Sequence, residues 1–138
     1  GVNGRLDTLQ AAVMLAKMEL FDEEVIARAQ IGARYSELLH GAVVTPFVSP
    51  ENTSVYAQYT VQIDNRELVQ KKLADIGVPT AVHYPVPLHL QPVFAFLGHG
   101  EGSFPVAEAA AKRVMSLPMH PYLTDNELVF IASKVVVL

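Results

Sequence analysis

The apolar residues of the first forty positions recur at helical intervals. Asp7 and Gln10 have the spacing of a helix-capping pair, so a helix is predicted to begin near Asp7. Over residues 9–21 only three positions are polar, so apolar side chains surround most of the helix. Over residues 22–39 the apolar side chains are confined to one stripe, which predicts that this part of the helix is half exposed. A continuous helix of this length would extend roughly 50 Å, longer than a domain of this size is wide. We therefore expect a bend near Asp22 or a projection into a neighbouring molecule.

The rest of the chain alternates between strand and helix periodicities. The expected elements are a strand over 55–63, a helix opened by Asp64 and Glu67 that stops at Gly77, a short strand over 80–84, a helix over 106–115 and a last helix capped by Thr124 and Glu127. This order predicts an α+β fold, in which helices cover a small, mainly antiparallel sheet. Residues 1–40 are expected to form a long interface helix, and residues 41–138 a small α+β domain.

Composition narrows the range of functions. The chain has 138 residues, 51% of them hydrophobic and 17% charged, which predicts one folded domain with a slight excess of apolar surface. The net charge of −4 and the lack of a basic cluster argue against nucleic acid as a partner. Cysteine is absent, which excludes disulfides and thiol nucleophiles and is compatible with a reducing compartment, so the cytoplasm is the predicted location.

The start of the chain carries a further expectation. The longest apolar run covers only residues 11–16, and no charged leader precedes it, so neither a membrane span nor a secretion signal is predicted. The chain opens on Gly1 instead of methionine, and we expect it to be a fragment of a longer protein.

The proline-rich segment 83–92 is the strongest candidate for a binding surface. It combines two imidazoles, a phenol and a carboxamide with three prolines, so it cannot form an α-helix or a central strand. Its stiff backbone would hold His83 and Tyr84 in a limited set of directions, where they could donate hydrogen bonds to substrate oxygens. The alternative is a rigid connector whose histidines lie at the surface.

The N-terminal residues 1–5 offer a second candidate. Backbone amides and the Asn3 carboxamide before a helix start could meet an anion, although a simple Asn-Gly turn explains the same residues. Arg5 could bind a carboxylate or phosphate through two hydrogen bonds, or could be a solvated charge.

Other kinds of site find little support in the sequence. The histidines at 83, 89, 99 and 120 lack helical ligand spacing, and we expect no metal. The turn over residues 117–121 is predicted either to brace the sheet or to present His120 at a rim. No nucleophile elbow, phosphate-binding glycine pattern or carboxylate pair is recognisable, so the chain carries no complete catalytic set.

Taken together, three groups of residues resemble the C-terminal part of the DegT/DnrJ/EryC1/StrS family, the pyridoxal-phosphate-dependent aminotransferases of nucleotide-linked keto sugars. They are Gly1 to Ala12, His83-Tyr84 with Pro87-Leu88-His89, and Pro105 with Glu108 followed by Leu117 to Pro121. The resemblance covers essentially the whole chain. It looks closest to members that aminate a UDP-linked 3-keto-N-acetylglucosaminuronic acid for surface polysaccharides.

The resemblance implies a fold-type I architecture, in which a cofactor domain precedes this smaller domain and two subunits of a homodimer share each active site. By analogy, Asn3 reaches the phosphate of pyridoxal 5'-phosphate (PLP) bound by the partner. Arg5, His83 and Tyr84 line the sugar pocket, Arg5 matching a uronic carboxylate, and His89 shapes the loop. The apolar helix after Asp7 would then face a second subunit.

The resemblance also places the Schiff-base lysine upstream of this chain. None of the five lysines present is expected to replace it, so the isolated chain is predicted to be inert, with no catalytic residue of its own. In the complete enzyme the amino donor would be glutamate. Three alternatives stay open. They are a dehydratase of the same family with histidine in place of the lysine, a non-catalytic dimerisation or small-ligand module, and a histidine-metal hydrolase.

Overall fold

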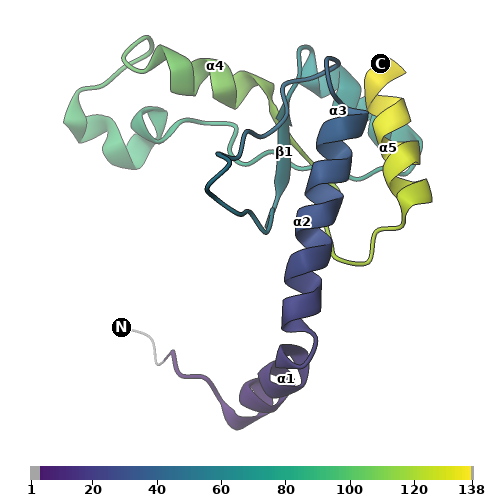
Figure 1. Cartoon of the computed structure of the whole chain (residues 1–138). Helices are drawn as coiled ribbons and strands as arrows, with labels where there is room; N and C mark the ends of the chain where they lie inside the picture. Colours follow the sequence, from purple (N-terminus) through teal and green to yellow (C-terminus); the bar gives the residue numbers. More distant parts are fainter. Residues whose placement is uncertain (1–3, 138) are drawn as a thin grey trace.

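A computed structural model describes residues 4–137 and shows an α+β fold, as predicted (Figure 1). Two short antiparallel strands lie among helices, and no helix in the described part of the chain is both long and apolar enough to cross a bilayer. The elements are α1 (Thr8–Met18), α2 (Phe21–Leu38), β1 (Tyr59–Gln62), α3 (Arg66–Asp75), the 3-10 helices η1 (Leu88–Leu90) and η2 (Pro92–Leu97), α4 (Pro105–Arg113), β2 (Val114–Leu117) and α5 (Asp125–Val137).

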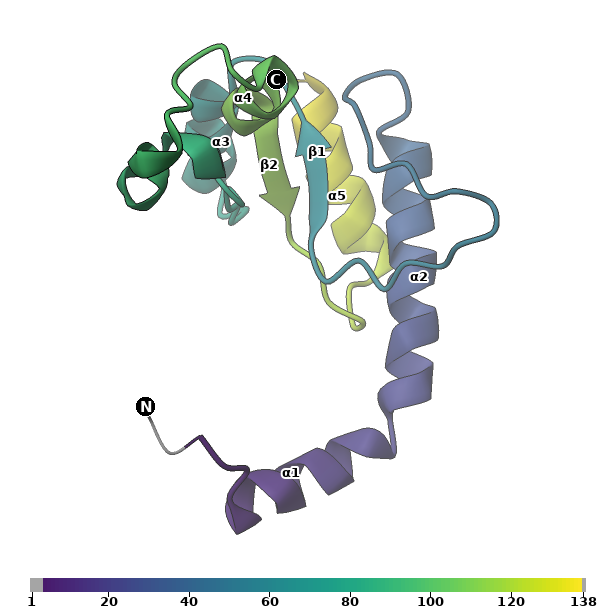
Figure 2. The same ribbon diagram turned by 90° about the vertical axis from the view of Figure 1, so that its left-hand side faces the viewer.

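The N-terminal helical segment is bent, as predicted. Asp7 Oδ1 accepts a hydrogen bond from the Gln10 amide at 2.8 Å, which confirms the predicted helix start. α1 ends at Met18, the next two residues form a turn, and α2 follows. Figure 2 shows α1 running across the direction of α2, so α1 stands apart from the rest of the molecule.

The core lies between the sheet and the helices α2, α3 and α5. The register pairs Tyr59 with Leu117 and Val61 with Met115, and all four side chains are buried on the same sheet face. The rings of Tyr35 and Tyr59 stack at 4.9 Å, and burial raises the pKa of both phenols. The core contains Ile31, Tyr35, Leu39, Tyr59, Val61, Val69, Leu73, Val78, Met115, Leu117, Leu128, Ile131, Ala132 and Val135.

The strand predicted over residues 55–63 is shorter in the structure, because Tyr56 diverts the chain. Tyr56 has a positive φ of 41°, and its carbonyl accepts a hydrogen bond from Arg28 Nη1 at 3.0 Å. Its ring lies directly over Gly32 of α2, where a Cβ would come within 2.3 Å of it. Regular pairing therefore begins only at Tyr59.

The helix predicted over residues 106–115 was wrong at its C-terminal end. α4 stops at Arg113, and residues 114–117 form β2, with Met115 fully buried. This strand is too short to show a clear period and owes its conformation to its pairing with β1. The strand predicted over residues 80–84 is reduced to one bridge, from Ala81 to Ser116. Pro79 and Pro85, on either side, restrict any longer ladder.

Two helix ends match the prediction and one does not. Gly77, with a φ of 80°, ends α3, and the Val78 amide donates to the Leu73 carbonyl at 2.9 Å. Thr124 and Glu127 cap α5 reciprocally, as their spacing predicted. Asp64 does not cap α3, because its carboxylate lies 2.9 Å from Arg113 Nε and the residue after it takes the cap position.

Candidate functional site

The proline-rich segment and α4 form an open cavity of about 520 Å³. In Figure 1 α4 belongs to an arm of the ribbon that extends away from α5. The cavity lies at the segment that the sequence singled out as a candidate binding wall. The lining is His83, Tyr84, Val86, Pro87, Leu88, His89, Gln91, Phe104, Ala107, Ala110, Ala111 and Val114. Most of these side chains are apolar, and the polar groups are few, which is typical of small-molecule sites.

Small side chains on α4 leave the space for this cavity. Ala107, Ala110 and Ala111 are three and four positions apart, so they share one face of the helix. The loop side adds rigid and bulky groups, among them Pro87 and Leu88. A larger side chain at any of the three alanines would fill part of the cavity.

Glu108 of α4 binds both the proline-rich segment and the glycine turn that precedes α4. Its carboxylate accepts hydrogen bonds from the Gly102 amide at 2.9 and 3.0 Å, from the Phe104 amide at 3.1 Å and from His89 Nε2 at 3.0 Å. These donors, the Gly102 amide first, lower the pKa of Glu108 below its ordinary value. His89 packs its ring 4.8 Å from that of Phe104. His89 therefore shapes the cavity wall, as the family resemblance implied.

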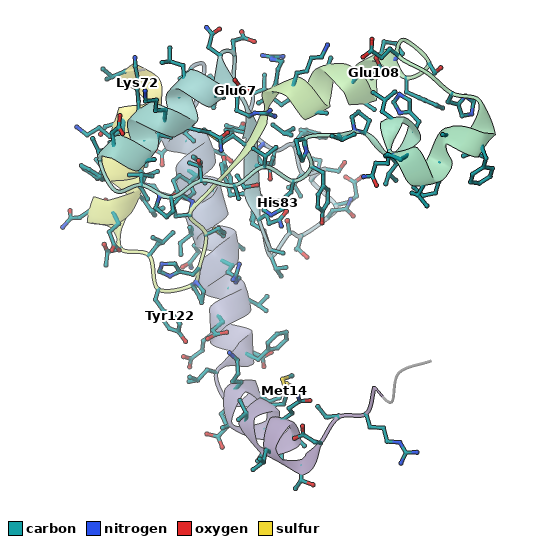
Figure 3. All side chains as sticks on the ribbon, turned by 180° about the vertical axis from the view of Figure 1, so that it is seen from behind. Met14, Glu67, Lys72, His83, Glu108 and Tyr122 are labelled. Atoms are coloured by element: carbon teal, nitrogen blue, oxygen red, sulfur yellow. The ribbon has the colours of Figure 1, made fainter. Side chains whose placement is uncertain are left out.

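His83, labelled in Figure 3, and its neighbour Tyr84 both line the cavity. Their rings are 5.7 Å apart in an edge-to-face arrangement. His83 Nδ1 lies 3.2 Å from Ser116 Oγ, whereas the Tyr84 side chain is largely exposed. A ligand in the cavity would thus meet an oriented imidazole and a phenol that is open to solvent.

The other two predicted site residues do not join this pair within one chain. Asn3 lies outside the described residues. Arg5 is exposed and lies three residues before α1. Figure 3 shows Met14 of α1 well apart from His83. The structure therefore brings together His83 and Tyr84, and leaves Arg5 available to another molecule.

The remaining histidines have separate environments. The His99 ring packs against Phe104 at 5.1 Å, and His120 Nδ1 accepts from the Tyr122 amide at 3.2 Å. Among residues 4–137 no three His, Cys, Asp or Glu side chains form a metal-binding group. The turn after β2 braces the core, since Tyr35 donates its hydroxyl to the Pro118 carbonyl at 3.0 Å.

The cavity does not hold a PLP molecule by itself. The aldehyde of this cofactor requires a lysine amine. The five lysines, all within the described residues, lie on α1, α3, α4 and α5, and none lines the cavity. The described residues of the cavity therefore lack the amine that would hold the aldehyde of this cofactor.

Comparison with known proteins places the chain in a family. The DegT/DnrJ/EryC1/StrS aminotransferase family profile matches residues 1–136, so the chain belongs to that family. It is 52% identical to the UDP-2-acetamido-2-deoxy-3-oxo-D-glucuronate aminotransferase of Pseudomonas aeruginosa, over 96% of this chain and 36% of that protein. The chain thus spans about a third of the length of that relative.

Solved structures agree with this assignment. A DegT DnrJ EryC1 StrS aminotransferase from Brucella abortus superposes with a TM-score of 0.90 at 38% identity, over 98% of this chain and 36% of that one. S. venezuelae DesV, solved in complex with a ketimine intermediate, gives 0.89 at 34% identity over 98% and 37%. The fold is therefore that of one part of an aminotransferase of this family.

Sequence reasoning missed three residues that build the site. Glu108 entered only as part of a family pattern, and the hydroxyls of Thr60 and Ser116 behind His83 were not considered. Ser116 was hidden because residues 114 and 115 were assigned to a helix. The one available signal was a serine between the apolar residues Met115 and Leu117.

Proposed function

We propose that this chain is the substrate-facing and dimer-forming C-terminal part of a PLP-dependent aminotransferase that transfers an amino group from glutamate to a nucleotide-linked keto sugar. The observation that carries the proposal is the cavity lined by His83 and Tyr84, on a chain of this family. The 52% identity to the Pseudomonas enzyme supports UDP-3-keto-N-acetylglucosaminuronic acid as the substrate. Surface polysaccharide biosynthesis, which the family resemblance implies, is the pathway that we propose for it.

The exposed surface of α1 supports a homodimer. No residue of α1 is buried, although Leu9, Val13 and Leu15 are apolar and more than 60% exposed. An apolar surface of this kind marks an interaction site. In the proposed dimer α1 contacts the second subunit, and Asn3 and Arg5 reach the partner's cofactor and sugar. This arrangement would bring Arg5 to an active site that its own chain does not complete.

The central experiment uses the full-length parent. We expect it to bind PLP, to change the cofactor absorbance when glutamate is added, and to convert a keto-sugar nucleotide into an amino sugar seen by mass spectrometry. Failure to form an amino sugar would refute the proposal. Loss of a sugar hydroxyl without consumption of an amino donor would indicate the dehydratase. Binding of the sugar nucleotide without turnover would indicate a non-catalytic module.

The role of Arg5 can be tested with two substrates. Arg5→Ala should raise the KM of the parent for a uronic substrate by roughly tenfold, because a charged hydrogen-bonding pair is lost. The KM for the matching neutral hexose should change by less than about twofold. Arg5→Lys keeps the charge without the two-pronged hydrogen-bonding geometry, so its KM for the uronic substrate should lie between those of the parent and of Arg5→Ala. Equal losses for both sugars would contradict the carboxylate role.

The proposed interface can be tested on the same parent. Leu9→Glu combined with Leu15→Glu should convert it from a dimer to a monomer in multi-angle light scattering, because two charges would be buried without partners. Lys71→Glu, an exposed charge reversal on α3 and outside α1, is the control and should leave a dimer. A double variant that stays dimeric would exclude α1 from the interface.

A further inference from the structure

Ser116 is a buried hydroxyl held on several sides. Its residue is 5% exposed, and its neighbours Met115 and Leu117 belong to the core. The backbone pairs with Ala81 in both directions, at 2.8 and 3.1 Å. The hydroxyl lies 2.8 Å from Thr60 Oγ1, directly across the sheet, and 3.2 Å from His83 Nδ1. A buried hydroxyl is costly unless it is hydrogen-bonded, and here both contacts are made on the sheet face opposite the core.

This contact distinguishes the two nitrogens of His83. Nδ1 is engaged by Ser116, whereas Nε2 has no hydrogen-bond partner among the described residues. Either Ser116 donates to Nδ1, which leaves the proton on Nε2, or Nδ1 donates to Ser116, which then donates to Thr60. Both arrangements hold the ring by Nδ1 and leave Nε2 for a ligand.

We propose that Ser116, backed by Thr60, is a positioning residue that orients the His83 imidazole toward an oxygen of the keto sugar. The inference rests on the proposed function, because it takes the cavity beside His83 as the sugar site. Ala81 supports the same geometry, since its two backbone hydrogen bonds anchor the segment two residues before His83. The ring is thus held by the sheet as well as by its own loop.

A double-mutant cycle in the full-length parent tests whether Ser116 acts through His83. Ser116→Ala should lower kcat/KM for the keto-sugar nucleotide roughly tenfold, the size of one lost orienting hydrogen bond. In a His83→Gln background the same change should have less than about a twofold effect. An equal loss in both backgrounds would show a merely structural role and overturn the proposal.

Matched variants separate orientation from folding. Thr60→Val removes the outer hydroxyl and should cost about two- to threefold, because the contact between Ser116 and His83 stays. Ser133→Ala removes a hydroxyl that donates to the Phe130 carbonyl on α5, and should not change kcat/KM. The glutamate half-reaction, followed without sugar, should proceed at the same rate in Ser116→Ala. A slowed glutamate half-reaction would contradict a role confined to the sugar.

A spectroscopic test does not depend on activity. In the parent labelled with 15N-histidine, Ser116→Ala should shift the His83 Nδ1 resonance, which His83→Gln assigns by its disappearance. An unchanged Nδ1 resonance would overturn the inference alone. If Ser116→Ala shifts the Nδ1 resonance but the parent makes no amino sugar, the contact between Ser116 and His83 stands. The proposed function, and with it the sugar as the ligand of His83, would then be refuted.

Discussion

The two N-terminal helices differ in burial in the opposite sense to their apolar content. α1 is the more apolar, yet none of its residues is buried, whereas the more charged α2 buries Ile31, Gly32 and Tyr35. α2 packs against α5, and its Tyr35 stacks on Tyr59 of the sheet, whereas α1 extends beyond them (Figure 2). The apolar content of a helix therefore does not show whether its own chain buries it. The contacts within the chain show that.

The largest expected effect comes from removing a buried side chain from the body of the molecule. Leu73 is fully buried, so Leu73→Ala should lower the unfolding free energy of the chain by about 2–5 kcal/mol in urea denaturation. Leu15 on α1 is 71% exposed, and Leu15→Ala should change it by less than about 0.5 kcal/mol. Equal losses of unfolding free energy in the two variants would contradict the contrast between α1 and the rest of the chain, here called the body.

A smaller effect is expected where α2 meets the loop before β1. Gly32→Ala would place a Cβ 2.3 Å from the Tyr56 ring, and should destabilise the chain by about 1–3 kcal/mol in the same assay. In a Tyr56→Ala background the same change should stabilise by up to about 1 kcal/mol, because alanine favours the helix. A loss in both backgrounds would contradict the role assigned to Tyr56.

Helix caps compare the two regions directly. Thr124→Ala removes the cap of α5, and should cost about 1 kcal/mol of global stability, measured by denaturation. Asp7→Ala removes the equivalent cap of α1. It should reduce the helicity seen by circular dichroism without moving the denaturation midpoint, because α1 contributes no residue to the core. A shifted midpoint in Asp7→Ala would show that α1 folds together with the body.

The smallest expected effect is local and depends on pH. The hydrogen bonds that Glu108 accepts lower its pKa in the folded chain. Their contribution to local stability is therefore present above the ordinary glutamate pKa, and is lost as the pH falls through the lowered pKa. The Gly102 and Phe104 amide resonances should then move together in NMR spectra. Glu108→Gln should abolish this transition. Its persistence in that variant would assign it to another group.

Much of the fold was predictable because the signals are local. Asp7, Gly77 and Thr124 mark helix ends through hydrogen bonds to residues within a few positions, so spacing alone finds them. β2 was not predictable, because four residues show no clear period and Met115 is buried only through its pairing with β1. Asp64 failed as a cap because Arg113, far along the chain, binds its carboxylate.

The candidate site divides in the same way. His83 and Tyr84 were predictable from the clustering of prolines, which stiffens the segment without any distant contact. Ser116 and Thr60 were not, since they reach His83 only after two strands pair across an interval of more than fifty residues. Glu108 likewise accepts its several hydrogen bonds only when the glycine turn folds back to α4.

The sequence by itself determined the helix periods, the stiff loop and the family, because each depends on residue types at short and regular spacings. The tertiary structure alone decided which apolar residues are buried, where β2 forms and which nitrogen of His83 is held. Burial, strand pairing and buried hydrogen bonds require surfaces that are distant along the chain. For α1 even the tertiary structure of one chain does not decide burial, because no surface of the described residues covers its apolar side chains.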